Sequence, residues 1–209
     1  MSKDEDIRDI KQRVGLSDPE NGKIVLFAPT RRHDAVGRSM YPFGMTADEF
    51  LHCLSEVAEG TRSTIVVRAH LKTGIEDVPD YPRIVWRPLA DYPDTEAILL
   101  ASDMLVCDWS SIAFDWLLLD RPTVFLDVKP PFAKGHTLDA SYRFGALVGD
   151  MRTLQESLRR FLAEPDAYHE RYDAQAARIR EAVFGGSSDG LAAERCIRCL
   201  QAALSSDHV

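Results

Sequence analysis

The sequence predicts an α/β fold, built as a doubly wound parallel sheet. Short apolar segments alternate with helical segments along the chain, which is typical of a parallel sheet covered by helices on both faces. The apolar runs IVLF, TIVV and MLVC lack the alternation of half-exposed strands and suit strands buried on both faces. The 209 residues, 45% of them hydrophobic, are enough for one such domain. We expect residues 1–22 to form an N-terminal helix and linker, and residues 23–204 to form the domain.

Three helices begin at recognisable signals. Apolar residues at helical spacing over residues 7–14 predict an N-terminal helix. Thr46 and Glu49 have the spacing of a capping box, in which each side chain accepts the amide of the other residue, and predict a helix that starts there. Thr153 and Glu156 have the same spacing and predict a third helix of the same kind.

Five strands are expected, each in a short apolar run. They lie in KIVLFAPT, STIVVRAH, RIVWRP, DMLVCD and PTVFLD. Between the third and fourth strands, Pro93 suits the first turn of a helix over PDTEAILLAS. The segment SSIAFDWLLL predicts a helix between the fourth and fifth strands, and a polar loop is expected after the fifth.

The C-terminal part of the sequence predicts a series of helices. Pro165 separates TLQESLRRFLAE from a long polar helix, which Gly185 and Gly186 end before the last helix begins. Cys196 and Cys199 lie three residues apart on one face of that last helix, beside leucines, and we expect them to pack in the core. Their CxxC spacing has no second pair of ligands, so the sequence does not indicate a zinc site.

Charge and hydropathy exclude several classes of protein. The net charge of −8 argues against a general nucleic-acid binder, which normally presents a basic face. No apolar run approaches the roughly 20 residues of a membrane-spanning helix, and the opening MSKDEDIRDIKQ lacks the pattern of a signal peptide. We therefore expect a cytoplasmic location.

Basic and hydroxyl side chains follow the predicted strands at the point where each ends. In such sheets ligands bind beyond the carboxyl ends of the strands. The guanidinium group of arginine can donate two parallel hydrogen bonds to the oxygens of one phosphate, and free backbone amides at the start of a helix attract anions. The phosphate-binding patterns GxGxxG and GxxxxGK[ST] are both absent. The combination of arginines, a histidine and the Ser110-Ser111 helix start at this edge predicts a phosphate or diphosphate ligand.

Several of these residues also allow a purely structural interpretation. Ser110 can cap the helix that follows it, and Asp115 can favour the dipole of the same helix. His70 can be structural or merely exposed, and Arg68 can pair with Asp108 to stabilise the end of the sheet. From the residues alone these alternatives stay open.

The ordered motifs resemble the C-terminal nucleotide-binding half of the CDP-glycerol glycerophosphotransferases, the teichoic acid polymerase family. The matching pieces are FAPTRR, VVRAH, the block DYPDTEAILLASDMLVCDWSSIAFDWLLLDRPTVF, and the late pair Asp189-Gly190. The resemblance covers roughly residues 10–200, and the long central block is its most specific part.

The resemblance implies a Rossmann-like half of a GT-B architecture and transfer of glycerol phosphate from CDP-glycerol to a hydroxyl of a cell-surface polymer, with CMP leaving. It implies no metal and no cofactor besides the donor substrate. Arg68 and His70 match its Arg-x-His element and are the expected catalytic residues, with His70 contacting the transferred phosphate. The remaining matches are Ser110 and Ser111 on the phosphates, Asp115 facing the ribose, Thr30 and Arg32 in the turn at the nucleotide, and Arg143 in a loosely similar later element.

The sequence departs from the family pattern at three positions: Leu71 stands where the family has proline, Trp109 where it has tyrosine, and Arg31 where it has an aromatic residue. These departures leave the donor open among CDP-glycerol, CDP-ribitol and another activated polyol or sugar.

No acceptor-binding half precedes FAPT, so we expect donor binding with little or no transfer unless such a half is supplied in cis or in trans. The expected acceptor is a polymer or a lipid-linked molecule, which would place the full enzyme at the inner face of the plasma membrane. The alternatives are half of a B-type sugar-nucleotide glycosyltransferase or epimerase, and a non-catalytic nucleotide-binding module.

Overall fold

The computed structural model describes residues 3–30, 41–68, 80–130 and 139–206. Six strands form one sheet: β1 (Lys23–Ala28), β2 (Ser63–Val67), β3 (Ile84–Trp86), β4 (Met104–Cys107), β5 (Thr123–Leu126) and β6 (Ala146–Val148). All pairings are parallel, in the order β3-β2-β1-β4-β5-β6. This is the Rossmann order, with the direction of winding reversed between β1 and β4. The predicted doubly wound α/β fold is confirmed.

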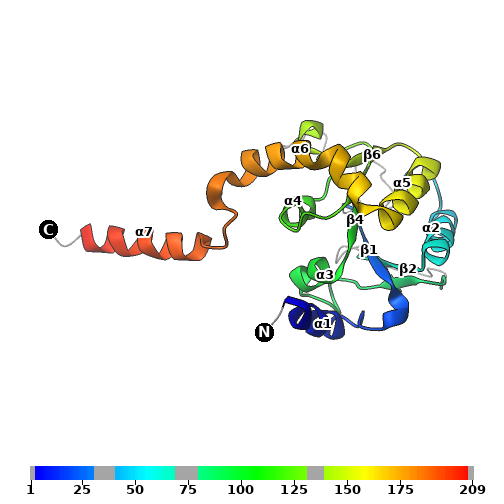
Figure 1. Cartoon of the computed structure of the whole chain (residues 1–209), viewed down its shortest axis with the longest axis horizontal. Coiled ribbons are helices and arrows are strands. Elements are labelled where there is room, and N and C mark those ends of the chain that lie inside the picture. Colours follow the sequence, from blue (N-terminus) through cyan, green and yellow to red (C-terminus); the bar gives the residue numbers. More distant parts are fainter. Residues whose placement is uncertain (1–2, 31–40, 69–79, 131–138, 207–209) are drawn as a thin grey trace.

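Helices cover both faces of the sheet (Figure 1). They are α1 (Lys3–Arg13), α2 (Ala47–Thr61), α3 (Thr95–Ala101), α4 (Ile112–Leu117), α5 (Met151–Ala163), α6 (Pro165–Phe184) and α7 (Ala192–Ser206), with short 3-10 turns η1 (Pro19–Asn21), η3 (Ala140–Tyr142) and η4 (Gly185–Ser187). Buried residues of α2 and α5 pack on one face, and those of α3 and α4 on the other. α6 contributes to both layers, with Tyr168 in the first and Ile179 in the second.

Strand β1 shows why its apolar run is continuous. Successive side chains of a strand point to opposite faces, so a strand covered on both sides needs apolar residues at every position. Val25 and Phe27 lie in the core layer beneath α2 and α5, while Ile24 and Leu26 lie in the layer beneath α3 and α4. All four side chains are at most 1% exposed.

The capping box predicted at the start of α2 is confirmed. The hydroxyl of Thr46 accepts the amide of Glu49 at 3.2 Å, and the Glu49 carboxylate accepts the amide of Thr46 at 2.8 Å. These hydrogen bonds from Thr46 hold the pKa of the Glu49 carboxyl below its usual value.

The starts of α3 and α5 differ from prediction, and each is capped by an aspartate. Asp150 accepts the amide of Thr153 at 2.7 Å, so the predicted capping box of Thr153 with Glu156 is wrong. Asp94 accepts the amide of Ala97 at 2.9 Å, which leaves Pro93 before the cap rather than in the first turn. An aspartate three residues before a free amide is among the most favourable N-caps.

Strand β6 lies in the segment expected to be a loop. It has only three residues at the edge of the sheet, and its middle side chain, Leu147, is 53% exposed. Just before it, Gly145 approaches β5 so closely that a Cβ there would lie 2.2 Å from the carbonyl oxygen of Thr123. The pairing of β6 therefore depends on a residue without a side chain.

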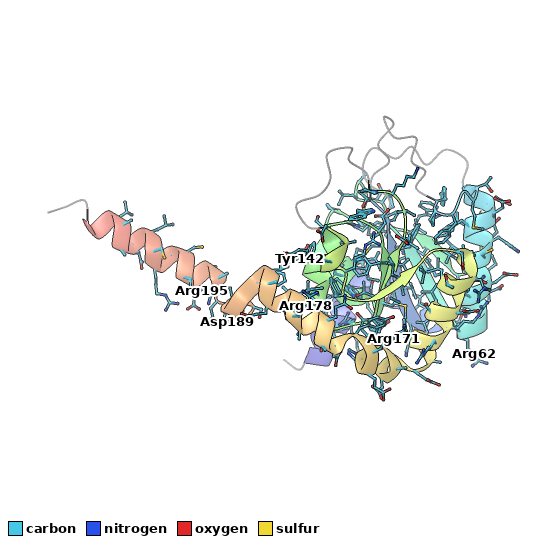
Figure 2. All side chains as sticks on the ribbon, turned by 90° about the horizontal axis from the view of Figure 1, so that it is seen from above. Arg62, Tyr142, Arg171, Arg178, Asp189 and Arg195 are labelled. Atoms are coloured by element: carbon cyan, nitrogen blue, oxygen red, sulfur yellow. The ribbon has the colours of Figure 1, made fainter. Side chains whose placement is uncertain are left out.

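Helix α7 projects away from the rest of the molecule (Figures 1 and 2). Its residues Cys196 and Cys199 are exposed, and Leu204 is 69% exposed, so the prediction that the two cysteines pack in the core is wrong. Arg195 pairs with Asp189 at 2.8 Å, which fixes the turn at the start of the helix. Within the described part of the chain, every helix is too short or too polar to cross a membrane.

Candidate functional site

The carboxyl ends of β1 and β4 meet where the winding of the sheet reverses. Asp108 follows β4, is 5% exposed, and accepts hydrogen bonds from both the backbone amide (2.7 Å) and the hydroxyl of Thr30, which follows β1. The same carboxylate oxygen accepts the amide of Trp109 at 2.6 Å. Asp108 thus joins the two strand ends at the place where open α/β sheets bind their ligands.

A pocket of about 240 Å³, here called the outer pocket, opens beside this junction. Four residues predicted to form the site line it together: Arg68, Ser110, Ser111 and Asp115. They come from the ends of two strands and from the first turns of α4, elements up to 47 positions apart in sequence. The fold brings these predicted residues to one pocket.

Neither serine hydroxyl caps α4. Ser111 occupies the N-cap position with a helical backbone, yet its side chain makes no capping hydrogen bond. The backbone carbonyls of Ser110 and Ser111 accept the amides of Ala113 and Phe114. Because neither hydroxyl bonds to any other residue that the structure describes, both can donate to a ligand, and the capping interpretation of Ser110 is wrong.

Arg68 is buried, with 6% of its surface exposed, and its guanidinium is hydrogen-bonded to the segment that runs from the end of β3 to the first residue of α3. Nη1 donates to the carbonyls of Arg87 (3.2 Å) and Tyr92 (3.0 Å), and Nη2 donates to the Thr95 hydroxyl at 2.7 Å. Burial lowers the pKa of Arg68 from its ordinary value. Among the described residues the guanidinium of Arg68 bonds to these three groups and not to Asp108, so that alternative is wrong. Arg68 forms part of the pocket wall, and its catalytic role stays a prediction.

Asp115 is exposed in the first turn of α4, and it also lines the outer pocket. Both interpretations of this residue, the helix dipole and the ligand, are compatible with that position. Its contact with a ribose stays a prediction.

A second, smaller cavity of about 30 Å³, here called the inner pocket, shares Ser110 with the outer pocket as a lining residue. Arg143 lines it with 6% exposure, and its guanidinium carbon lies 4.3 Å from the centre of the Trp109 ring. Nη1 of Arg143 pairs with Asp127 at 3.5 Å. Burial lowers the pKa of Arg143, and Asp127 partly offsets this effect.

The structure thus gathers Arg68, Ser110, Ser111, Asp115 and Arg143 around two adjoining cavities, with Thr30 fixed at the junction. Arg32 and His70 lie outside the described residues. The sequence did not indicate that Trp109 would support Arg143. The two are 34 positions apart, and only the pairing of β4, β5 and β6 brings them together.

One group of described side chains has the composition of a metal site, and it lies elsewhere. Asp120, His169 and Asp173 have potential ligand atoms within 4.8 Å of one another. Asp120 precedes β5, so the group lies at the amino end of the sheet, opposite the two pockets. Its members already pair with other side chains: Asp120 with Arg180 at 2.8 Å, and His169 with Asp173 at 2.9 Å.

Residues 1–201 match the model of the family described as CDP-Glycerol:Poly(glycerophosphate) glycerophosphotransferase. The chain belongs to this family. It is 27% identical over 198 residues to the teichoic acid glycerol-phosphate transferase of Staphylococcus aureus (strain NCTC 8325 / PS 47), a match that covers 85% of this chain and 49% of that relative. The predicted resemblance to the glycerophosphotransferase family is confirmed.

Solved structures show the same fold. The wall teichoic acid polymerase TagF superposes with a TM-score of 0.70 at 20% identity, over 99% of this chain and 50% of that chain. MnaA of S. aureus, solved with UDP, gives 0.54 at 15% identity over 94% of this chain and 49% of that one. The domain is therefore the Rossmann-like half of a GT-B architecture. This glycerophosphotransferase-family chain spans about half the length of the relatives it matches.

Proposed function

We propose that this chain is the donor-binding domain of a transferase that moves glycerol phosphate from CDP-glycerol to a hydroxyl of a cell-surface polymer and releases CMP. The observation that carries the proposal is the outer pocket, where the hydroxyls of Ser110 and Ser111 lie at the switch point of the sheet and bond to no other described residue. The family match supplies the chemical class of the donor.

The chemistry requires stabilisation of charge. The acceptor oxygen bonds to the phosphorus that carries glycerol, the bond from that phosphorus to the bridging oxygen breaks, and CMP leaves with the electron pair. The proton of the acceptor hydroxyl passes to a base or to water. Donors fixed in place before the reaction stabilise the charge that develops on the leaving phosphate.

The residues have distinct roles in this proposal. The hydroxyls of Ser110 and Ser111 donate to the diphosphate, and His70 contacts the transferred phosphate. The Asp115 carboxylate accepts hydrogen bonds from the ribose hydroxyls. Arg68 holds the wall of the pocket in place through the loop that it binds. Thr30 and Arg32 are assigned to contacts with the nucleotide.

A similar structure supports CDP-glycerol as the donor. One of the TagF structures is a variant soaked with CDPG, and it superposes on this chain with a TM-score of 0.68. Because the chain spans half of its relatives, we propose that transfer needs an acceptor-binding half, in cis or in trans. A lipid-linked acceptor would bring the complete enzyme to the membrane surface.

Binding of nucleotides tests the proposal. We expect this chain to bind CDP-glycerol and CDP with dissociation constants on the order of micromolar in calorimetric titration, and UDP more weakly. Ser110→Ala is expected to lower the affinity for CDP-glycerol about tenfold, because one hydrogen bond to a charged group is lost. The matched control is Ser188→Ala, an exposed serine beyond α6, which should bind like the wild type.

Two results would count against the proposal. A preference for UDP over CDP would favour a sugar-nucleotide enzyme of the B type. Tight binding of CDP-glycerol without any transfer, even when an acceptor and an acceptor-binding half are supplied, would favour the alternative that this chain is a non-catalytic binding module.

A further inference from the structure

Arg143 has an unused hydrogen-bonding edge inside the inner pocket. Its side chain is 7% exposed, and its Nε and Nη2 atoms are buried without a hydrogen-bond partner among the described residues. Buried donors of a charged group are nearly always paired, and an exception calls for a missing partner. An acceptor from outside the described residues is therefore expected at this edge.

The surroundings hold the guanidinium in one orientation. The Trp109 ring lies 4.3 Å from the guanidinium carbon, and the Phe125 ring lies 5.9 Å from it. Trp109 is itself fixed, because its indole N–H donates to the carbonyl of Val128 at 2.8 Å. Asp127 occupies Nη1 on the other edge of the fork. Stacking and the ion pair thus leave the Nε–Nη2 edge as the one available for a ligand.

That edge has the geometry for an oxyanion. Nε–H and one Nη2–H point the same way from the planar guanidinium, so they can donate to two oxygens of one phosphoryl or carboxylate group. The nearby carboxylates of Asp108 and Asp139 are already hydrogen-bonded, Asp108 to Thr30 and Asp139 to Ser141. They do not occupy the open edge of Arg143.

The size of the cavity limits what can enter it. About 30 Å³ has room for roughly one or two oxygen atoms, whereas the outer pocket offers about 240 Å³. Ser110 lines both cavities. The two cavities therefore adjoin at Ser110, the residue past which a ligand in the outer pocket would have to extend a charged group to meet Arg143.

We propose that the inner pocket is an oxyanion subsite in which Nε and Nη2 of Arg143 bind one phosphoryl group of the donor in a bidentate manner, and that Trp109 serves as the platform that orients this arginine. The inference rests on the proposed function, because it assigns to Arg143 one of the two phosphates of that donor. It makes Arg143 a determinant of specificity for a diphosphate over a nucleoside.

The test uses the whole chain with two probes, CDP-glycerol and inorganic pyrophosphate, titrated by calorimetry. Arg143→Lys keeps the charge but removes the pair of parallel N–H donors. We expect this variant to bind both probes with at least tenfold lower affinity, while its affinity for cytidine stays unchanged. The matched control is Arg178→Lys, an exposed arginine that donates to the carbonyl of Ser141 in the same loop and lies beside Tyr142 (Figure 2). This control is expected to bind both probes like the wild type.

The outcomes separate this inference from the proposed function. If Arg143→Lys binds both probes like the wild type, the subsite is overturned and the donor proposal stands. If CDP-glycerol fails to bind the wild type but pyrophosphate binds and is lost in Arg143→Lys, the subsite stands and the donor is wrong. Failure of the wild type to bind either probe overturns both.

A second measurement needs no variant and covers the case in which Arg143→Lys does not fold. In a crystal of the wild-type chain soaked with pyrophosphate or CDP-glycerol, we expect two phosphoryl oxygens within about 3.2 Å of Nε and Nη2. Density for a water molecule at this edge, with the phosphates bound elsewhere, would overturn the subsite.

Discussion

Arg68 is a residue whose position in the fold could be predicted from the sequence, whereas its hydrogen-bond partners could not. Its place after an apolar strand predicted that it lies at the carboxyl edge of the sheet, and the structure confirms that position beside the outer pocket. Its hydrogen bonds go to two carbonyls between β3 and α3 and to the hydroxyl of the first residue of α3, none of which has a sequence signal. The same limit applies to Ser110, for which a free hydroxyl and a helix cap look alike in sequence.

The bonding of Arg68 leads to a prediction about stability. Arg68→Lys leaves a charge at the site but cannot reach the carbonyls of Arg87 and Tyr92 together with the Thr95 hydroxyl. We expect the free energy of unfolding to fall by about 2 kcal/mol, because three half-buried acceptors lose the hydrogen bonds of a buried charged donor. Urea denaturation followed by circular dichroism measures this change. Arg171→Lys, at an exposed position of α6, is the matched control (Figure 2); an equal loss in both variants would contradict the structural role of Arg68.

At the scale of elements, the sequence predicted those whose signal is local. Continuous apolar runs predicted β1, β2 and β4, and the spacing of Thr46 and Glu49 predicted the start of α2. Strand β6 was missed because three residues at a sheet edge are stabilised by pairing with β5 and by the absence of a side chain at Gly145. The inner pocket depends on this edge, so it could not be predicted from any local pattern.

The N-cap of α5 gives a prediction about pH. Hydrogen bonds from the amide and hydroxyl of Thr153 hold the pKa of Asp150 below its ordinary value. A depressed carboxyl pKa contributes stability above the ordinary aspartate pKa and loses it as the pH falls through the folded value. At neutral pH we expect Asp150→Ala to lower the thermal midpoint by about 2–4 °C. Asp150→Asn keeps an acceptor and should lose less.

The pH series separates the charge from the hydrogen bond. The difference in thermal midpoint between wild type and Asp150→Asn is expected to shrink as the pH falls below about 4. Differential scanning calorimetry from pH 7 to pH 3 measures it. A difference that grows toward acid would show that the Asp150 carboxylate is not stabilised in the folded chain.

At the scale of the whole molecule, the site belongs to no single element. The ends of β1, β2 and β4, the first turn of α4 and the residue after η3 each supply one part, and the sheet order brings them together. The six-stranded body therefore carries the whole described part of the site. Helix α7 lies outside this arrangement, with all its described side chains exposed except the half-buried Arg195.

This division leads to a prediction about truncation. Removing residues 189–209 deletes α7, whose described side chains bury little surface against the body, so we expect the thermal midpoint to change by about 1 °C or less. The matched control removes residues 165–209 and so deletes α6 as well, with its buried Tyr168, Ala176 and Ile179. Because both core layers then lose part of their cover, this longer truncation should lower the midpoint by about 10 °C or more, or prevent folding. Calorimetry on both chains measures the two shifts. A large loss on removal of α7 alone would mean that this helix packs against the body in solution.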